Sequence, residues 1–196
     1  MTQVDQLDRA ALPELEPIFA AVEAGMGFVP NSFLTMAHWP ELVQTFTPLA
    51  ATVLNGGVVD SGLKQLLAHV ASSAAGCRYC QAHTAHNATR RGVSAEKVAA
   101  AFEFERSTLF SAAERAALRV AAKGGTQPNA IEAADMTALA EHFEPRAIVE
   151  IVAVIALFGF LNRWNDSLAT TLEDHPTAFA TEHLAGSGWT AGKHGT

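Results

Sequence analysis

The stretch LKQLLAHVASSAAGCRYCQAHTAH, residues 63–86, decides the fold. Its first half carries apolar residues at helical spacing, which predicts a helix over residues 61–75 with one side in the core. Gly76 then permits a sharp turn or a close approach of the backbone. A second helix is expected over residues 77–90, so two cysteines and two histidines fall on the same helix.

The rest of the chain also has the pattern of helices, and no alternation of apolar and polar residues is strong enough to predict a strand. Further helices are expected over residues 13–25, 40–54, 94 onward, 111–123, 130–142 and 145–172. Ser111 and Glu114 fit a capping box, and Pro145 suits the first turn of a helix. The expected fold class is therefore all-α, in one domain over residues 1–196 whose end, residues 186–196, is poorly ordered.

Composition and charge narrow the function. The chain has 196 residues, of which 49% are hydrophobic, and its net charge of −7 without a basic cluster argues against a nucleic-acid partner. No signal peptide is visible at the N-terminus. The most apolar run, residues 151–161, is shorter than the ~20 residues that a membrane span needs. We expect a cytoplasmic protein without membrane contact, and in that reducing compartment a CxxC is catalytic or metal-binding rather than a structural staple.

Cys77 and Cys80 are the only cysteines in the chain. A thiol in the first turn of a helix meets free N–H groups and the positive end of the helix dipole, which lower its pKa and make it a nucleophile. The other thiol, three residues away, can resolve the oxidised product as a disulfide. His83 lies one turn beyond Cys80, within reach as a base or acid, whereas His86 lies roughly opposite Cys77 around the helix. For His86 a packing role is as good an interpretation as a catalytic one.

The motif has other interpretations. Cys-x2-Cys-x2-His-x2-His contains the ligand types of zinc, but four side chains along one helix cannot converge on one ion, so zinc would need a ligand from elsewhere. The two thiols could instead be small buried residues without chemistry. A thioredoxin fold is disfavoured because no strand leads into the motif. We expect no metal and no cofactor.

Around these cysteines the chain resembles the carboxymuconolactone decarboxylase-like superfamily, and within it the AhpD-like alkylhydroperoxidases and their peroxidase-related relatives. Residues 63–86 carry the specific part of the resemblance, and residues 92–96, 109–118 and 160–167 also fit. The similarity extends over about residues 27–172. It implies an all-helical AhpD-like bundle that self-associates as a dimer, trimer or hexamer and performs thiol peroxidase chemistry.

The resemblance also implies roles for single residues. Cys80 would be the peroxidatic cysteine and Cys77 the resolving one, with a hydroperoxide as substrate and a thiol or dithiol as reductant. Two positions depart from the family: Gln65 stands where a proton-relaying Glu is expected, and Thr84 stands where a His is expected, with His83 one residue earlier. Gln cannot exchange a proton, although it can orient a neighbouring group by hydrogen bonding.

Three functional hypotheses follow. The leading one is a thiol-dependent (alkyl hydro)peroxidase or disulfide reductase that works through the dithiol. The alternatives are a decarboxylase or isomerase of the carboxymuconolactone type, which does not need a CxxC, and a non-enzymatic oligomeric redox sensor. Glu114 or Glu150 is a candidate for the missing carboxylate. Trp39, Trp164 and Phe160 could line a pocket near the thiols or be ordinary core.

Overall fold

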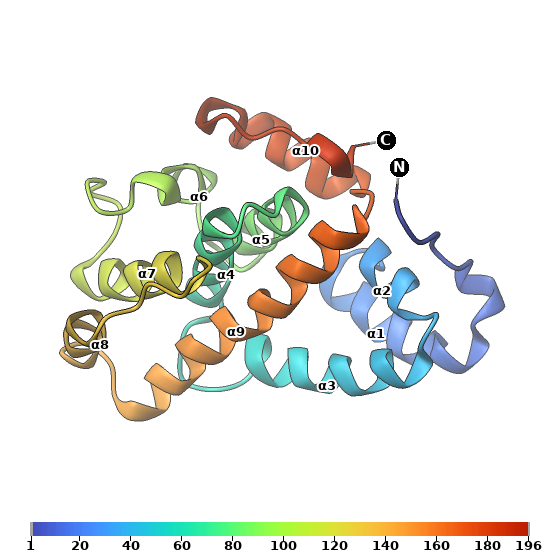
Figure 1. Cartoon of the computed structure of the whole chain (residues 1–196), viewed down its shortest axis with the longest axis horizontal. Helices are drawn as coiled ribbons and strands as arrows, with labels where there is room; N and C mark the ends of the chain where they lie inside the picture. Colours follow the sequence, from blue (N-terminus) through green and yellow to red (C-terminus); the bar gives the residue numbers. More distant parts are fainter. Residues whose placement is uncertain (1, 196) are drawn as a thin grey trace.

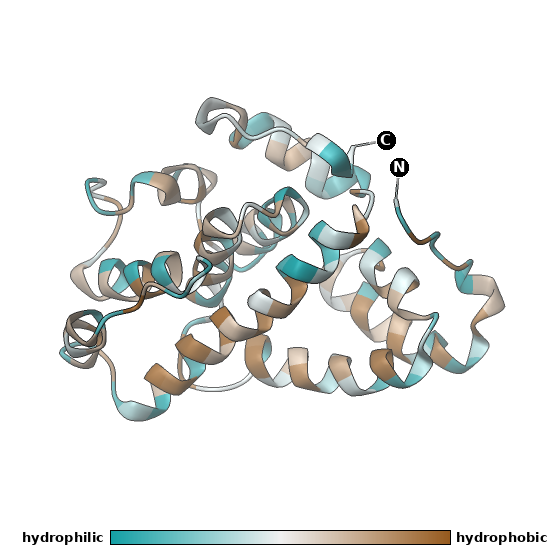
Figure 2. Ribbon diagram, in the orientation of Figure 1, coloured by the Kyte–Doolittle hydropathy of each residue, from teal (hydrophilic) through white to brown (hydrophobic). Residues whose placement is uncertain are grey.

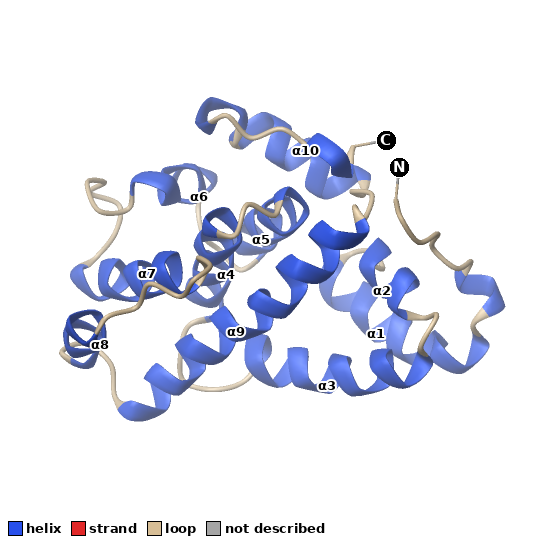
Figure 3. Ribbon diagram, in the orientation of Figure 1, coloured by secondary structure: helices blue, strands red, loops and turns tan. Residues whose placement is uncertain are grey.

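The structure, a computed structural model, describes residues 2–195 and contains helices without any strand over that range (Figure 3). Its α-helices are α1 (Glu16–Met26), α2 (Asn31–Met36), α3 (Pro40–Asn55), α4 (Ser61–Ala74), α5 (Arg78–Arg90), α6 (Ala95–Ala99), α7 (Ala112–Gly124), α8 (Ala133–Ala140), α9 (Pro145–Leu168) and α10 (Asp174–His183). Short 3-10 helices cover Arg9–Ala11, Pro13–Leu15, Ala100–Glu103, Ala185–Ser187 and Gly192–His194. The predicted all-α fold class is confirmed.

Helix α9 runs diagonally across the molecule, and the other helices are arranged around it (Figure 1). It packs against α3, α4, α5 and α7, while α4 and α5 make the most extensive contact between any two helices of the described chain. Helices α1 to α3 lie on one side of α9 and α6 to α8 on the other, and α10 packs on α5. The helix pair that carries the cysteines is therefore enclosed at the centre.

Two clusters of buried apolar side chains form the core. The larger one joins α4, α5, α7 and α9, and it includes Leu67 and Ile151. The smaller one is built mainly by the N-terminal helices and includes Phe19 and Val43. Helix α9 contributes to both, since Ile151 belongs to the larger cluster and Leu157 to the smaller one. The boundary between the two clusters thus runs along α9.

Hydrophobic residues are concentrated along α9 (Figure 2). The helix has 24 residues and is therefore longer than the apolar run 151–161 identified in the sequence. By length and composition alone it could cross a membrane. In this fold, however, Ile151, Val154 and Phe158 are buried in the core. The core helix of a globular protein meets the same criterion, so packing against neighbouring helices accounts for the apolar character of α9.

A buried carboxylate fixes the loop that leads into α4. Glu150 accepts hydrogen bonds from the backbone N–H groups of Val58 and Val59 at 3.0 Å and pairs with the Lys64 ammonium at 3.1 Å. Gly57 in this loop has a φ of +95°, and a Cβ at that position would overlap the Glu150 carboxyl group. Glu150 therefore joins α9 to the start of α4 and keeps α4 in place beside α5.

Several helices differ from their predicted bounds. Helices α2 and α10 lie in segments where the sequence pattern predicted no helix. The helix expected over residues 130–142 is restricted to Ala133–Ala140. The helix expected to reach residue 172 ends at Leu168, because Ala169 adopts a left-handed conformation with a φ of 49° and turns the chain.

The C-terminal segment packs onto the core up to residue 195, which differs from the expectation of a poorly ordered tail. Trp189 and His194 are both buried, with exposed fractions of 4% and 1%. The Trp189 indole N–H donates to the Arg78 carbonyl at 3.3 Å, and the Leu172 N–H donates to the His194 carbonyl at 2.9 Å. Each of these two hydrogen bonds joins the segment to a residue elsewhere in the chain. The composition of the segment alone therefore does not predict that it is packed.

Candidate active site

The two cysteines lie at the start of α5 because Gly76 turns the chain between α4 and α5. Gly76 has a φ of +77°, a region that favours glycine. Cys77 is the N-cap residue of α5, and its Sγ accepts a hydrogen bond from the Cys80 backbone N–H at 3.5 Å. Both cysteines are buried free thiols. The dithiol therefore lies at the positive end of the helix dipole.

Cys77 is the more acidic thiol. Hydrogen bonding from the Cys80 thiol is the largest cause; burial opposes it, and His194 adds to it, so the pKa of Cys77 is lowered to about 6. Burial first, and then the adjoining Cys77 sulfur, raise the pKa of Cys80 well above its ordinary value. Of the two sulfurs, Cys77 is therefore the one that more readily carries a negative charge.

Cys80 lines a partly open cavity of about 380 Å³, whereas Cys77 does not. The cavity lies at the boundary of the two apolar clusters, and its walls come from α1, α2, α3, α4, α5 and α9. Its apolar lining includes Val22, Phe33, Phe46, Phe158 and Leu161. Asn165 on α9 donates a hydrogen bond from Nδ2 to the Cys80 sulfur at 3.5 Å. Cys80 is thus the sulfur that a small molecule in the cavity would meet.

Two buried amide oxygens in the cavity wall have no hydrogen-bond partner within residues 2–195. They are Oε1 of Gln65 and Oδ1 of Asn165, on side chains with exposed fractions of 4% and 1%. A buried acceptor without a partner costs about 1–3 kcal/mol. A bound molecule with an N–H or O–H group would satisfy such an acceptor. Gln65, at the position of the family's Glu, therefore offers the cavity a hydrogen-bond acceptor rather than a titratable group.

His83, which also lines the cavity, is paired with a carboxylate that no sequence motif predicted. Its Nε2 lies 2.5 Å from Oε2 of Glu173, which immediately precedes α10. The other carboxylate oxygen accepts hydrogen bonds from the Tyr79 hydroxyl at 2.8 Å and from the Asn31 backbone N–H. Burial alone would raise the pKa of Glu173, but His83 and these hydrogen bonds outweigh burial and lower it. Glu173 therefore stands beside His83 as a charged carboxylate.

The two carboxylates proposed from the sequence have other roles. Glu114 caps the start of α7 and pairs with Lys97 at 2.6 Å. Glu150 holds the loop before α4, as described above for the fold. Neither lines the cavity at Cys80. The carboxylate that contacts a histidine of the cavity wall is Glu173, which is 90 residues away from His83 in the sequence.

Other residues singled out in the sequence lie away from the cavity wall. His86 is outside it and packs against Phe28, with 6.4 Å between the ring centroids, which supports its packing role. Trp39 is 62% exposed and Phe160 is 41% exposed, so neither is a core residue. Trp164 stacks on Phe160 and packs against the smaller apolar cluster, also outside the wall.

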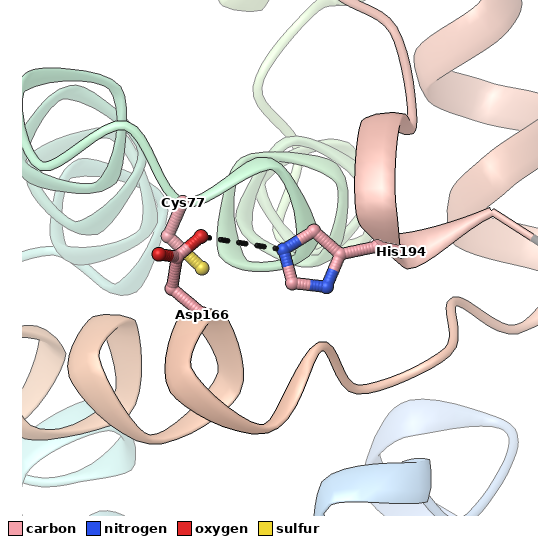
Figure 4. A group of neighbouring side chains, drawn as sticks. All are labelled: Cys77, Asp166 and His194. Carbon is pink, nitrogen blue, oxygen red and sulfur yellow. Dashed lines mark ion pairs between the residues drawn. The ribbon is translucent and has the colours of Figure 1, made fainter. Parts of the chain in front are cut away.

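A second group of side chains surrounds Cys77, outside the cavity wall (Figure 4). Sγ of Cys77, a carboxylate oxygen of Asp166 and a ring nitrogen of His194 lie within 4.8 Å of one another. Oδ1 of Asp166 is 3.6 Å from Nε2 of His194, and Nδ1 of His194 is 2.8 Å from the Thr170 carbonyl oxygen. Neither Asp166 nor His194 was predicted as a site residue from the sequence. No spacing signal connects either residue to the CxxC motif.

Fold and site together define an AhpD-like protein, with a helical bundle and a buried dithiol at the start of a central helix. Residues 40–123, which include both cysteines, match the model of the carboxymuconolactone decarboxylase family. The chain belongs to this family.

Solved structures share the fold over nearly the whole chain. The apo debrominase Bmp8 is 41% identical, with a TM-score of 0.87, and the match covers 93% of this chain and 98% of Bmp8. A cysteine-to-alanine variant of Bmp8, in complex with 2,3,4-tribromopyrrole, is similar to the same degree. A peroxidase-related protein from Ralstonia eutropha JMP134 with an alkylhydroperoxidase AhpD core is 25% identical, with a TM-score of 0.80, and the match covers 91% of this chain and 95% of that protein.

One curated relative matches over a shorter region. YnjA of Escherichia coli K12 is 33% identical over 92 residues, which are 47% of this chain. The chain matches half of the length of YnjA, 50%.

Proposed function

We propose that the protein is a thiol-dependent reductase that removes a halogen from a small aromatic ring, with Cys80 as the attacking thiol and Cys77 as the resolving one. The observation that carries this proposal is the placement of the two sulfurs. Cys80 lines an apolar cavity, and the acidic Cys77 lies next to it outside the cavity wall. A substrate in the cavity meets Cys80, and Cys77 is in position to close the disulfide.

The substrate class is supported by the cavity and by one relative. The unpaired oxygens of Gln65 and Asn165 suit a ring that carries an N–H or O–H group, and the apolar walls suit its remaining surface. The chain is 41% identical to the debrominase Bmp8 over almost its entire length. A halogenated pyrrole or phenol has the size, the donor group and the leaving atom that this site would use.

The proposed reaction balances with two thiols. The halogen-bearing carbon takes up a proton, and Cys80 passes its own proton to the adjoining Cys77 sulfur. The resulting Cys80 thiolate removes the halogen, so that an S–halogen bond forms while the C–halogen electron pair returns to the ring. Cys77 attacks the Cys80 sulfur, a disulfide forms, and halide leaves. The ring is reduced by two electrons and the dithiol is oxidised by two. An external thiol or dithiol then reduces the disulfide.

His83 is the proposed proton donor to the ring. It lines the cavity, and Glu173 lies 2.5 Å from its Nε2. A carboxylate in this position fixes the orientation of the imidazole. The His83–Glu173 pair would thus carry out the proton transfer that a Glu performs in the family and that Gln65, at the same position, cannot.

A hydroperoxide is the second candidate substrate, because relatives of this fold include peroxidase-related proteins. In that reaction Cys80 passes its proton to the adjoining Cys77 sulfur, the Cys80 thiolate attacks the terminal oxygen, and the O–O bond breaks. The alkoxide takes a proton from His83 and leaves as the alcohol. Cys77 then displaces the hydroxyl of the Cys80 sulfenic acid as water, and the same disulfide results. Both candidates use one dithiol and one reductant, so activity must be measured on both substrates.

The test compares halide release with peroxide consumption. Reduced protein is incubated without oxygen with a brominated pyrrole or a brominated phenol and dithiothreitol, and bromide and the debrominated ring are quantified. We expect turnover by the wild type, loss of at least ~10²-fold in Cys80→Ser, and at most one turnover in Cys77→Ser. Peroxide consumption without bromide release would select the second candidate. Equal rates in wild type and Cys80→Ser on both substrates would overturn the thiol mechanism.

Two histidines on the same helix provide a matched control for the proton donor. We expect His83→Asn to slow bromide release by ~10²-fold, as is usual for loss of a general acid. His86→Asn should leave the rate unchanged, because His86 packs against Phe28 outside the cavity wall. Equal effects of the two substitutions would remove His83 from the mechanism.

A further inference from the structure

We propose that His194, carried by the C-terminal segment, is the base that keeps Cys77 ionised, and that Asp166 positions its imidazole. The segment would then be part of the active site. This inference rests on the proposed role of Cys77 as the resolving thiol. It concerns the reduced dithiol alone, so it holds for either candidate substrate.

The orientation of the imidazole follows from its hydrogen bond. Nδ1 of His194 lies 2.8 Å from the Thr170 carbonyl oxygen, which can only accept, so Nδ1 carries a hydrogen. In the neutral ring the lone pair is then on Nε2. Nε2 is buried without a hydrogen-bond partner among the described residues, and its neighbours are Asp166 and the Cys77 sulfur (Figure 4). A proton that leaves Cys77 therefore has an acceptor directly beside it.

The charges around His194 favour the transfer. Burial by itself lowers the pKa of His194, but Cys77, the Thr170 carbonyl and Asp166 outweigh burial and raise it. The other groups that face this region are the Tyr79 ring, 5.9 Å from the imidazole centroid, and Lys193, which pairs with Asp166 at 2.8 Å. The resulting arrangement is a thiolate and an imidazolium with a carboxylate next to the imidazolium.

The C-terminal segment is held where this arrangement needs it. Trp189 is buried and donates a hydrogen bond to the carbonyl of Arg78, the residue that follows Cys77. The backbone of His194 accepts a hydrogen bond from Leu172 at 2.9 Å. These contacts tie residues 189–194 to both the first turn of α5 and the chain after α9. Covering the core does not by itself explain why the segment has an unpaired imidazole nitrogen next to the Cys77 sulfur.

The role of His194 in the reaction is limited to the proton of Cys77. In the neutral pair, the thiol S–H bond breaks, its proton moves to Nε2, and the electron pair stays on the Cys77 sulfur. That sulfur then attacks Cys80, the S–S bond forms and the leaving group departs. After this step no thiolate faces the imidazolium, and His194 releases its proton by way of Asp166, whose side chain is 43% exposed.

The first test measures the ionisation of Cys77 directly. Because the chain has two cysteines, protein labelled with ¹³C at cysteine Cβ gives two signals, which the Cys80→Ser variant assigns. In the wild type the Cys77 signal should titrate near pH 6. We expect His194→Asn to move this midpoint upward by one pH unit or more and Asp166→Asn to move it upward by less. His183→Asn, another histidine substitution near the C-terminus, should leave it unchanged.

The second test uses the wild-type protein and does not depend on a variant that folds. The His194 ring is followed by ¹⁵N NMR in the reduced protein and after oxidation of the dithiol with diamide. We expect the midpoint of His194 to fall on oxidation, because the thiolate that stabilises the imidazolium is lost. An unchanged midpoint would overturn the pairing of His194 with Cys77.

Two further outcomes would also overturn the inference. One is an unchanged Cys77 midpoint in both His194→Asn and Asp166→Asn, with the assigned indole N–H NMR signal of Trp189 showing that the segment is still packed. The other is one equivalent of tightly bound zinc in the reduced wild type that is lost in His194→Asn, which would make these side chains metal ligands. None of these measurements uses a substrate. The result for His194 is therefore independent of whether the protein removes halogen from a ring.

Discussion

The Glu173 carboxylate lies 2.5 Å from the imidazole of His83, although 90 residues separate the two in the chain. The pair gives the cavity a carboxylate and an imidazole despite Gln65 at the position of the family's Glu. In the proposed mechanism, proton transfer next to Cys80 depends on the segment that immediately precedes α10, and not on α4. The contact also ties that segment to α5.

Substitution of Glu173 should affect catalysis more than binding. Glu173→Gln keeps the shape of the side chain but removes the negative charge beside the His83 imidazole. We expect the rate of bromide release to fall by ~10²-fold with little change in KM. Glu182→Gln, on the exposed side of α10, is the matched control and should behave as wild type. Equal kinetics in both variants would mean that the Glu173–His83 pair is only structural.

The unpaired oxygen of Gln65 predicts a dependence on the donor group of the substrate. Gln65→Leu removes this acceptor while keeping a side chain of similar size. We expect about a fivefold loss of kcat/KM for a halogenated pyrrole, since a neutral hydrogen bond is worth about 1 kcal/mol. The N-methylated pyrrole lacks the donor, so the substitution should not reduce its turnover. A similar loss for both rings would show that Gln65 acts through packing.

Acid stability should depend on Glu150. Burial alone would raise the pKa of this carboxyl group, but Arg146, the N–H groups of Val58 and Val59, and Lys64 lower it from 4.5 to about 2. Because the folded-state pKa is the lower one, the stabilisation is complete above pH 4.5 and is lost as the pH falls toward 2. Glu150→Gln should lack this loss between pH 4.5 and 2, as measured by urea unfolding at a series of pH values.

The same substitution should also lower stability at neutral pH. Removal of the charge leaves the Lys64 ammonium, with a side chain only 1% exposed, without its ion partner. We expect a decrease of about 3 kcal/mol in the free energy of unfolding. Glu141→Gln changes an exposed carboxylate and should have almost no effect. If the two variants were equally stable, the buried pair would not support the fold.

One face of α9 predicts self-association, which the family resemblance also implies. Val149, Val152 and Phe160 are exposed on this helix at spacings that put them on one side, with Ala156 between them. We propose that this stripe is covered by another copy of the chain. Val152→Asp should shift the mass measured by light scattering toward the monomer. Val58→Asp, at an exposed valine in the loop after α3, should not; dissociation by both or by neither would argue against the stripe.

The features of this structure that could be predicted from the sequence are those set by residues close together in the chain, such as the position of a helix. Helical periodicity identified α4 and α5, and Gly76 between them gave the position of the dithiol at a helix start. Glu173, Asp166 and His194 were missed, because each meets its partner only after the chain has folded back. The composition of the C-terminal segment, rich in Gly and Ala, predicted disorder, whereas its packing depends on Trp189 and His194.

Two consecutive residues of α9, Asn165 and Asp166, lie near different cysteine sulfurs. Asn165 faces Cys80 and the cavity, whereas Asp166 faces Cys77 and His194. A rotation of ~100° per residue accounts for this divergence. In the proposed mechanism, α9 thus contributes one residue to the cavity that receives the substrate and the next residue to the group around Cys77. Substitutions in the cavity wall would then change the accepted substrate without altering the surroundings of Cys77.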